Sequence, residues 1–121
     1  NPGGIEAFIQ TAGEISHRQG KKPWLLFAAV SDKDYERMAE QLCKEMIWEA
    51  VGVVHMNSDR GLAAEALARV FRTYTSRPVY SYGDTKSAVL DMAEKSREGL
   101  LFCAGSLYLI GEIKAVLEQK T

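Results

Sequence analysis

Four short apolar runs, separated by segments with a helical repeat, constrain the fold of this chain more than any other feature. Two of the runs are almost continuously apolar, without the alternation of a half-exposed strand. This pattern is typical of strands that helices cover on both faces, as in parallel sheets. The runs occupy residues 24–30, 50–56, 78–82 and 100–104. We therefore expect four strands in a mainly parallel sheet.

The segments around the strands repeat apolar residues at i, i+3 or i+4, and i+7, which predicts helices with one buried face. The repeats fall within residues 5–15, 35–46, 63–71, 88–93 and 109–117. Asp84 is placed to cap the fourth helix, and Ser31 or Asp32 to cap the second. The alternation predicts one α/β domain over residues 1–121, a Rossmann-like three-layer α/β/α sandwich with a mainly parallel sheet.

Composition and charge argue against several classes of function. The chain is 46% apolar and 26% charged, which is ordinary for a globular domain. The net charge of -1 gives no electrostatic reason to expect nucleic acid or an anionic membrane as a partner. Cys43 and Cys103 lack metal-ligand spacing and are too few for a disulfide framework. We expect two buried thiols, a cytoplasmic location and no metal site.

Polar segments follow each predicted strand, at residues 31–34, 57–61, 83–86 and 105–106. Ligands of parallel α/β sheets bind off the carboxyl ends of the strands, so these segments are the candidate binding loops. Gly105 and Ser106 give the sharpest signal, because glycine permits close approach and the next helix N-terminus suits a carboxylate or phosphate. The simpler interpretation makes Ser106 a helix N-cap.

The other binding loops also admit two interpretations. Asp32, Lys33 and Asp34 could handle a substrate ammonium or a magnesium-bound phosphate, or they could form a charged first helical turn. Asp59 and Arg60 could clamp a carboxylate, or they could be solvated loop residues. Taken alone, these residues favour the structural interpretation in both loops.

The sequence lacks the motifs of several common enzyme classes. It has no G-x-x-x-x-G-K-[ST] phosphate loop, no G-x-G-x-x-G after the first strand and no G-x-S-x-G elbow. His17 and His55 have no cysteine or carboxylate close enough in sequence to argue a catalytic pair. Trp24 and Trp48 flank strand starts and are expected to be packing residues. No catalytic residue is predicted.

One block of the sequence carries a family likeness. Residues 105–113 read Gly-Ser-Leu-Tyr-Leu-Ile-Gly-Glu-Ile, which closely resembles the Gly-Ser-Leu-Tyr-Leu-(Val/Ile)-Gly-Glu segment of bacterial folylpolyglutamate synthase/dihydrofolate synthase. The opening Asn1-Pro2 looks like the end of that family's Asp-Gly-Ala-His-Asn-Pro motif, and residues 31–34 match its Asp-Lys-Asp loop. The likeness spans essentially the whole chain in order and spacing.

The resemblance implies the C-terminal domain of an ATP-dependent ligase of the Mur ligase superfamily. In that family, ATP phosphorylates a carboxylate of dihydropteroate or a reduced folate, and the amine of glutamate attacks the acyl phosphate. A larger N-terminal domain carries the phosphate loop and would bind most of the ATP and Mg²⁺. The resemblance thus implies that this chain belongs to a longer enzyme and is inactive alone.

The resemblance also assigns candidate site residues. Ser106 matches a family serine associated with glutamate binding, and Asn1 and Pro2 match positions on the nucleotide side of the cleft. Residues 31–34 match a loop that faces the cleft. Arg60 stands where the family has the arginine of a Pro-Arg-Ala-like turn, but the proline is missing here.

Two alternatives stay open at the level of the sequence. The chain could be a free-standing, non-catalytic α/β domain that binds or senses a small molecule at the same strand ends. It could also belong to a Mur-type ligase that acts on cell-wall precursors, although the Gly-Ser-Leu-Tyr block favours the folate branch.

Overall fold

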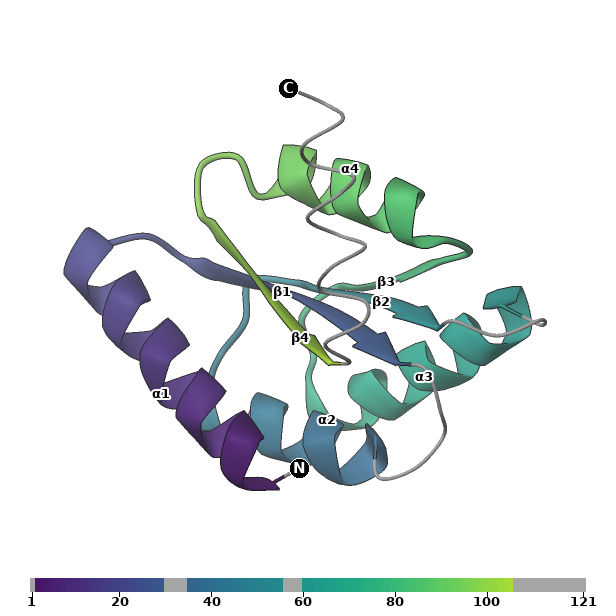
Figure 1. Ribbon diagram of the computed structural model, residues 1–121, viewed down its shortest axis with the longest axis horizontal. Helices are drawn as coiled ribbons and strands as arrows, with labels where there is room; N and C mark the ends of the chain where they lie inside the picture. Colours follow the sequence, from purple (N-terminus) through teal and green to yellow (C-terminus); the bar gives the residue numbers. More distant parts are fainter. Residues whose placement is uncertain (1, 30–34, 56–59, 106–121) are drawn as a thin grey trace.

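The computed structural model describes residues 2–29, 35–55 and 60–105, and these residues alternate between helices and strands (Figure 1). The helices are α1 (Pro2–Gln19), α2 (Tyr35–Glu45), α3 (Arg60–Tyr74) and α4 (Thr85–Lys95). The strands are β1 (Pro23–Ala29), β2 (Val51–His55), β3 (Val79–Tyr82) and β4 (Leu100–Gly105). All four predicted strands and the first four predicted helices are confirmed. The fifth predicted helix, at 109–117, lies outside the described residues.

The four strands form one sheet in the order β3-β2-β1-β4, and all three neighbouring pairs are parallel. The chain runs outward from β1 through β2 to β3 and then returns to place β4 on the other side of β1. The direction of strand succession therefore reverses at β1. The fold of the described residues is α/β with a parallel sheet, and it is compatible with a Rossmann-like arrangement.

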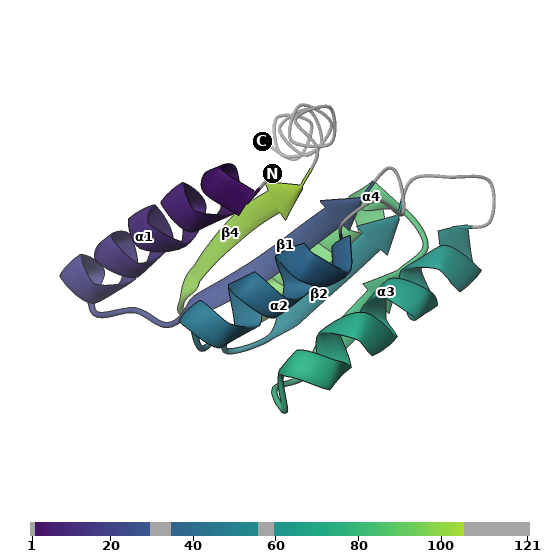
Figure 2. The same cartoon turned by 90° about the horizontal axis from the view of Figure 1, so that it is seen from below.

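Helices α1, α2 and α3 lie side by side on one face of the sheet (Figure 2). They bury the residues of β1 and β2 that point to this face, among them Phe27 and Val53. The Phe27 ring packs against Phe71 of α3, with centroids 5.2 Å apart. Trp48, only 1% exposed, donates its indole N–H to the carbonyl oxygen of Leu42 at 3.0 Å. Aromatic side chains thus fill this side of the core.

The opposite face of the sheet is covered by α4 (Figure 1), which buries a smaller cluster. Met92 of α4 lies directly over Gly52 of β2, and a Cβ added to Gly52 would stand 2.8 Å from the Met92 Cγ and Sδ atoms. No heavy atoms pack that closely without a shift, so the absence of a side chain at Gly52 allows α4 to sit on the sheet.

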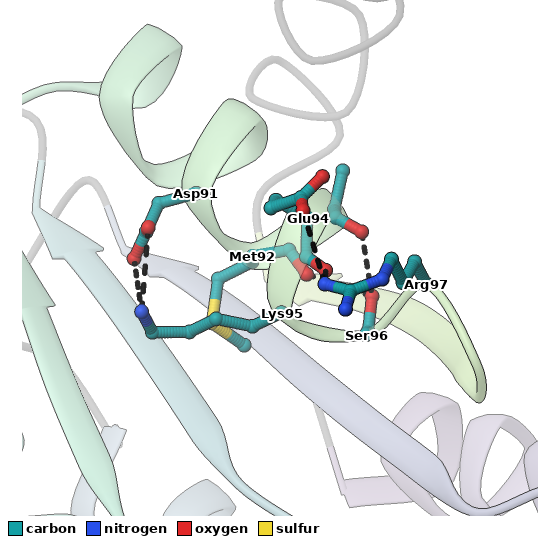
Figure 3. Close-up of polar contacts among 7 residues, drawn as sticks. Asp91, Met92, Glu94, Lys95, Ser96 and Arg97 are labelled. Atoms are coloured by element: carbon teal, nitrogen blue, oxygen red, sulfur yellow. Dashed lines mark hydrogen bonds and ion pairs between the residues drawn. The ribbon is translucent and has the colours of Figure 1, made fainter.

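Capping fixes the ends of α4. The Asp84 carboxylate accepts a hydrogen bond from the Ser87 backbone N–H at 2.8 Å, so Asp84 is the N-cap that the sequence predicts. At the other end, the Ser96 hydroxyl donates to the Met92 carbonyl at 2.7 Å (Figure 3). Arg97 bonds back to Glu94 in the same turn. These contacts end the helix just before the turn into β4.

Strand β3 lies at the edge of the sheet and is held by side chains of α3. The Pro78 carbonyl accepts from the Val51 N–H of β2 at 2.9 Å, so the next carbonyl, that of Val79, points away from the sheet. Arg72 donates to this outward carbonyl at 2.9 Å. Glu65 accepts from both Arg72, at 2.9 Å, and the Ser81 hydroxyl, at 2.8 Å, and ties the same strand to α3.

In the described ranges, none of the helices combines the length and apolar character needed to cross a membrane. The longest of them, α1, has 18 residues and a polar face.

Candidate functional site

The carboxyl ends of β1 and β4 lie next to each other at one edge of the sheet, which we call the carboxyl edge. Ala28 of β1 is the register partner of Gly105 of β4, and Ala29 is the partner of His55 of β2. The strand arrows in Figure 2 point to this same edge. Because strand succession reverses between β1 and β4, this is the place where ligands of open parallel sheets bind.

Gly105 closes β4 in a conformation that only glycine adopts readily. Its φ is +126°, and a Cβ at this position would stand 1.9 Å from the carbonyl oxygen of Ala28. The backbone of β4 therefore presses against β1 as the chain leaves the sheet. The close approach expected at Gly105 is made by the neighbouring strand.

The predicted site residues fall in two groups. Five of them lie outside the described residues: Asn1, Asp32, Lys33, Asp34 and Ser106. The other two, Pro2 and Arg60, are the first residues of α1 and α3. Each of these helices runs back toward the start of the following strand, so both helices begin toward the carboxyl edge. The backbone positions of Pro2 and Arg60 therefore lie on the side of the sheet where the site is expected.

His55 ends β2 at the carboxyl edge and is buried, with 2% of its surface exposed. The sequence offers His55 no catalytic partner, and the histidine lies in the core at the strand end. Its burial in an apolar strand argues against contact with a ligand in solution.

A polar cluster beside β3 and α4 was not foreseen from the sequence. The Tyr82 hydroxyl donates to the Asp91 carboxylate at 2.5 Å, and the Lys95 ammonium lies 3.2 Å from the same carboxylate. Figure 3 shows Asp91 and Lys95 pointing toward one another along α4. The spacing of Asp91 and Lys95, four apart on a predicted helix, was a visible signal for their ion pair. Nothing local in the sequence indicated Tyr82.

The charged and polar groups of this cluster stabilise the fold and are not set up for proton transfer. The hydrogen bond from Tyr82, followed by the contact with Lys95, holds the pKa of Asp91 below its ordinary value. Burial, followed by the hydrogen bond to Asp91, raises the pKa of Tyr82. Tyr82 therefore stays protonated and Asp91 ionised near neutral pH, and neither group is suited to exchange protons with a substrate.

The two thiols are unreactive because they stay protonated near neutral pH. Burial raises the pKa of Cys43 and of Cys103 to about 11 in each case. Each thiol is half-buried, which is less than the full burial expected from the sequence. A protonated thiol is a poor nucleophile and a poor metal ligand. Over the described ranges, His, Cys, Asp and Glu side chains form no group of three that could hold a metal ion.

In comparisons with known proteins, no family model, no curated protein and no solved structure matches the chain. The α/β fold with its parallel sheet thus rests on the structure itself, and the functional argument rests on the geometry of the carboxyl edge and on the sequence motifs.

Proposed function

We propose that this chain is the C-terminal domain of an ATP-dependent ligase of the folylpolyglutamate synthase/dihydrofolate synthase type. In this proposal it is a three-layer domain like those of the Mur ligases. Its role is to hold glutamate while a larger N-terminal domain, its partner, holds ATP, Mg²⁺ and the folate or dihydropteroate substrate. In this proposal the glutamate site lies at the carboxyl edge.

The adjacency of the β1 and β4 ends is the observation that supports the proposal most. The two sequence segments that carry the family likeness, 31–34 and 105–113, leave the sheet from these two neighbouring strands. Segments more than 70 residues apart in the chain therefore start from one place. A ligand bound at the reversal point of the sheet can touch both of them.

Each site residue has a role in this proposal. Ser106 hydrogen-bonds the anionic glutamate, and the start of the helix predicted after it adds favourable partial positive charge. Asp32, Lys33 and Asp34, together with Asn1, Pro2 and Arg60, face the nucleotide side of the closed cleft.

ATP, with Mg²⁺, supplies the phosphoryl group that activates the acceptor carboxylate. The present chain contributes position: it presents the glutamate amine to the activated carbonyl carbon after the ammonium has released a proton to solvent, and the second N–H proton is released to solvent as the C–N bond forms. An amide bond forms as phosphate leaves. Closure of the two domains excludes water and so protects the activated acid from hydrolysis.

The first test is Ser106→Ala in the complete enzyme. Loss of one hydrogen bond to a charged group costs about 1.5–3 kcal/mol, so the apparent constant for glutamate should rise roughly 10- to 150-fold. Ser76→Ala is the matched control, because Ser76 is exposed in the turn before β3, at the opposite edge of the sheet. An unchanged constant for glutamate in the Ser106→Ala enzyme would remove the role given to this serine.

A second test separates the ligase from the non-catalytic module. The isolated chain, mixed with ATP, Mg²⁺, glutamate and dihydropteroate, should release no ADP above the buffer rate. Adding the complete N-terminal domain should restore ADP release that depends on glutamate. ADP release by the isolated chain, or no release after the domains are combined, contradicts the proposal.

A further inference from the structure

A hollow lies apart from the carboxyl edge, at the opposite edge of the sheet, where the strands begin. It has a volume of about 490 Å³, within the range of small-molecule pockets. We call it the amino-edge hollow and define it by Lys21, Lys22, Trp24, Arg77, Tyr80 and Lys95. Because β1 is seven residues long, the hollow lies roughly 20 Å from the carboxyl edge.

Two glycines shape this hollow. Gly20 turns the chain from α1 toward β1 with a φ of +62°. Gly99, before β4, packs so tightly that a Cβ there would lie 2.5 Å from the Lys22 carbonyl oxygen and 3.0 Å from the Trp24 indole nitrogen. The Lys22 carbonyl also accepts from the Leu100 N–H at 2.9 Å. The α1–β1 and α4–β4 turns are thus fastened together, and the absence of a side chain at Gly99 leaves the edge of the indole uncovered.

The two tryptophans of the chain differ in where their indole N–H groups find an acceptor. Trp48 satisfies its indole N–H with the Leu42 carbonyl. Trp24 is half-buried in the wall of the hollow, and no acceptor for its indole N–H is found over residues 2–29, 35–55 and 60–105. The Trp24 N–H opens to the hollow and to solvent, where it can donate to water or to an acceptor atom of a bound molecule.

The charge around the hollow favours an anion. Four basic and two acidic side chains line it, although the whole chain carries a net charge of -1. Glu49 is engaged by Lys22, at 3.3 Å, and by Arg77, which also donates to the Glu49 carbonyl at 3.1 Å. These pairs fix Arg77 and Lys22 in place. Lys95 is paired with Asp91, and Glu98 also lines the hollow. The four basic groups therefore exceed the three acidic ones by a single positive charge.

The walls of the hollow also offer flat surfaces. The Lys95 ammonium lies 5.0 Å from the centre of the Tyr80 ring, and Asp91 holds it from the side (Figure 3). Tyr80 is one of two large apolar side chains that stand exposed in the described part of the molecule. Trp24 lies across the same hollow. A flat ring between these side chains would bury apolar area while its charged group meets the lysines.

We propose that the amino-edge hollow binds a small planar organic anion, a ring system that carries a carboxylate. The anion accepts from the Trp24 indole N–H and pairs with Lys21, and its ring rests against Trp24 and Tyr80. This site is independent of the glutamate site at the carboxyl edge, so either can fail without the other.

The test is an NMR titration of the 121-residue chain with 2-naphthoate. The spectrum contains two indole N–H signals, from Trp24 and Trp48, and Trp24→Phe assigns them by removing one. The Trp24 signal should shift with saturation, and the Trp48 signal should stay in place and report an intact fold. Inorganic phosphate, which lacks the ring, and 2-naphthol, which lacks the carboxylate, should both bind at least tenfold more weakly.

Variants sharpen the same experiment. Lys21→Gln should raise the dissociation constant roughly threefold, and Trp24→Phe on the order of fivefold, with the amides of Gly20 and Gly99 as reporters. Lys86→Gln, an exposed lysine at the far end of α4, is the charge-matched control and should change nothing. The proposal is overturned if the Trp24 signal does not move, if 2-naphthol or phosphate binds as well as 2-naphthoate, or if Lys21→Gln and Lys86→Gln behave alike.

Discussion

The two faces of the sheet are held by different physical means. On the face covered by α1, α2 and α3, large aromatic side chains such as Phe27 and Phe71 fill the space between the layers. On the face covered by α4, the helix is drawn in close over Gly52, and caps and hydrogen bonds fix its ends. The comparison teaches that stability on the first face depends on the volume buried, and on the second face on how closely one helix approaches. Four substitutions test this contrast, and they are given in order of decreasing loss of stability.

The largest effect is expected from Phe71→Ala on the first face. The ring is fully buried against Phe27, so its loss leaves a cavity and should lower the free energy of unfolding by about 3–5 kcal/mol. Urea denaturation of the chain measures this change. Ile47→Ala is the control, because Ile47 is 83% exposed and should cost no more than about 0.5 kcal/mol. Equal losses for the two variants would contradict a core filled by aromatic side chains.

Gly52→Ala tests the close approach of α4. The added methyl group collides with Met92 and should cost about 1–3 kcal/mol of stability through overpacking. In the double variant with Met92→Ala, the loss of stability should be smaller than the sum of the two single losses by at least about 0.5 kcal/mol, because the collision is relieved. Gly13→Ala is the matched control: an added methyl there meets no atom within 4 Å, and helical alanine is favoured. Additive losses would show that α4 is not held against Gly52.

Asp84→Ala should lower the free energy of unfolding by about 1 kcal/mol, because the first turn of α4 loses its N-cap. Asp84→Asn keeps an acceptor oxygen and should retain most of the stability. Thermal unfolding followed by circular dichroism distinguishes the two. If asparagine were as damaging as alanine, charge near the helix N-terminus, and not capping, would be the stabilising factor.

The smallest effect should come from Tyr82→Phe, and it should depend on pH. The hydroxyl holds the pKa of Asp91 below its ordinary value. A depressed carboxyl pKa contributes stability that is present above the unfolded pKa and is lost as the pH falls through the folded value. At pH 7 the free energy of unfolding of the variant should be lower by no more than about 1 kcal/mol, because the carboxylate is largely exposed.

In acid the gap between wild type and Tyr82→Phe should close as the pH falls through the folded pKa of Asp91, which lies below the ordinary carboxyl value, since Asp91 is then protonated in both proteins. Denaturant midpoints at a series of pH values measure this difference in stability between the two proteins. A gap that stays constant from neutral pH into acid would mean that the hydroxyl stabilises the fold without acting through the charge of Asp91.

The contrast between the faces also explains what could be predicted from the sequence. Strands and helices followed from apolar runs and repeats, and the Asp84 cap followed from its place before a helix, because these signals are local. The order β3-β2-β1-β4 and the contact of Met92 with Gly52 did not follow, since both depend on which distant elements meet. The same reason kept the amino-edge hollow out of the sequence analysis: its walls come from the starts of several strands. Trp24, expected only to pack, turned out to face that hollow.

For the candidate site, the sequence indicated which residue types take part. The structure showed where some of these residues lie relative to one another. The adjacency of the β1 and β4 ends could not be read from the chain, because it depends on the return of the strand after α4 to the far side of β1. Gly105 was singled out for its small size, and the structure gives the reason, a backbone contact with Ala28.

The contact of Arg72 with the outward carbonyl of Val79 has a consequence for crowded solutions. An exposed edge strand offers its unpaired amide and carbonyl groups to any extended chain, and this is a common route to aggregation. Here the guanidinium occupies the Val79 carbonyl on a strand of only four residues, so little template remains for a second molecule to extend the sheet at the β3 edge.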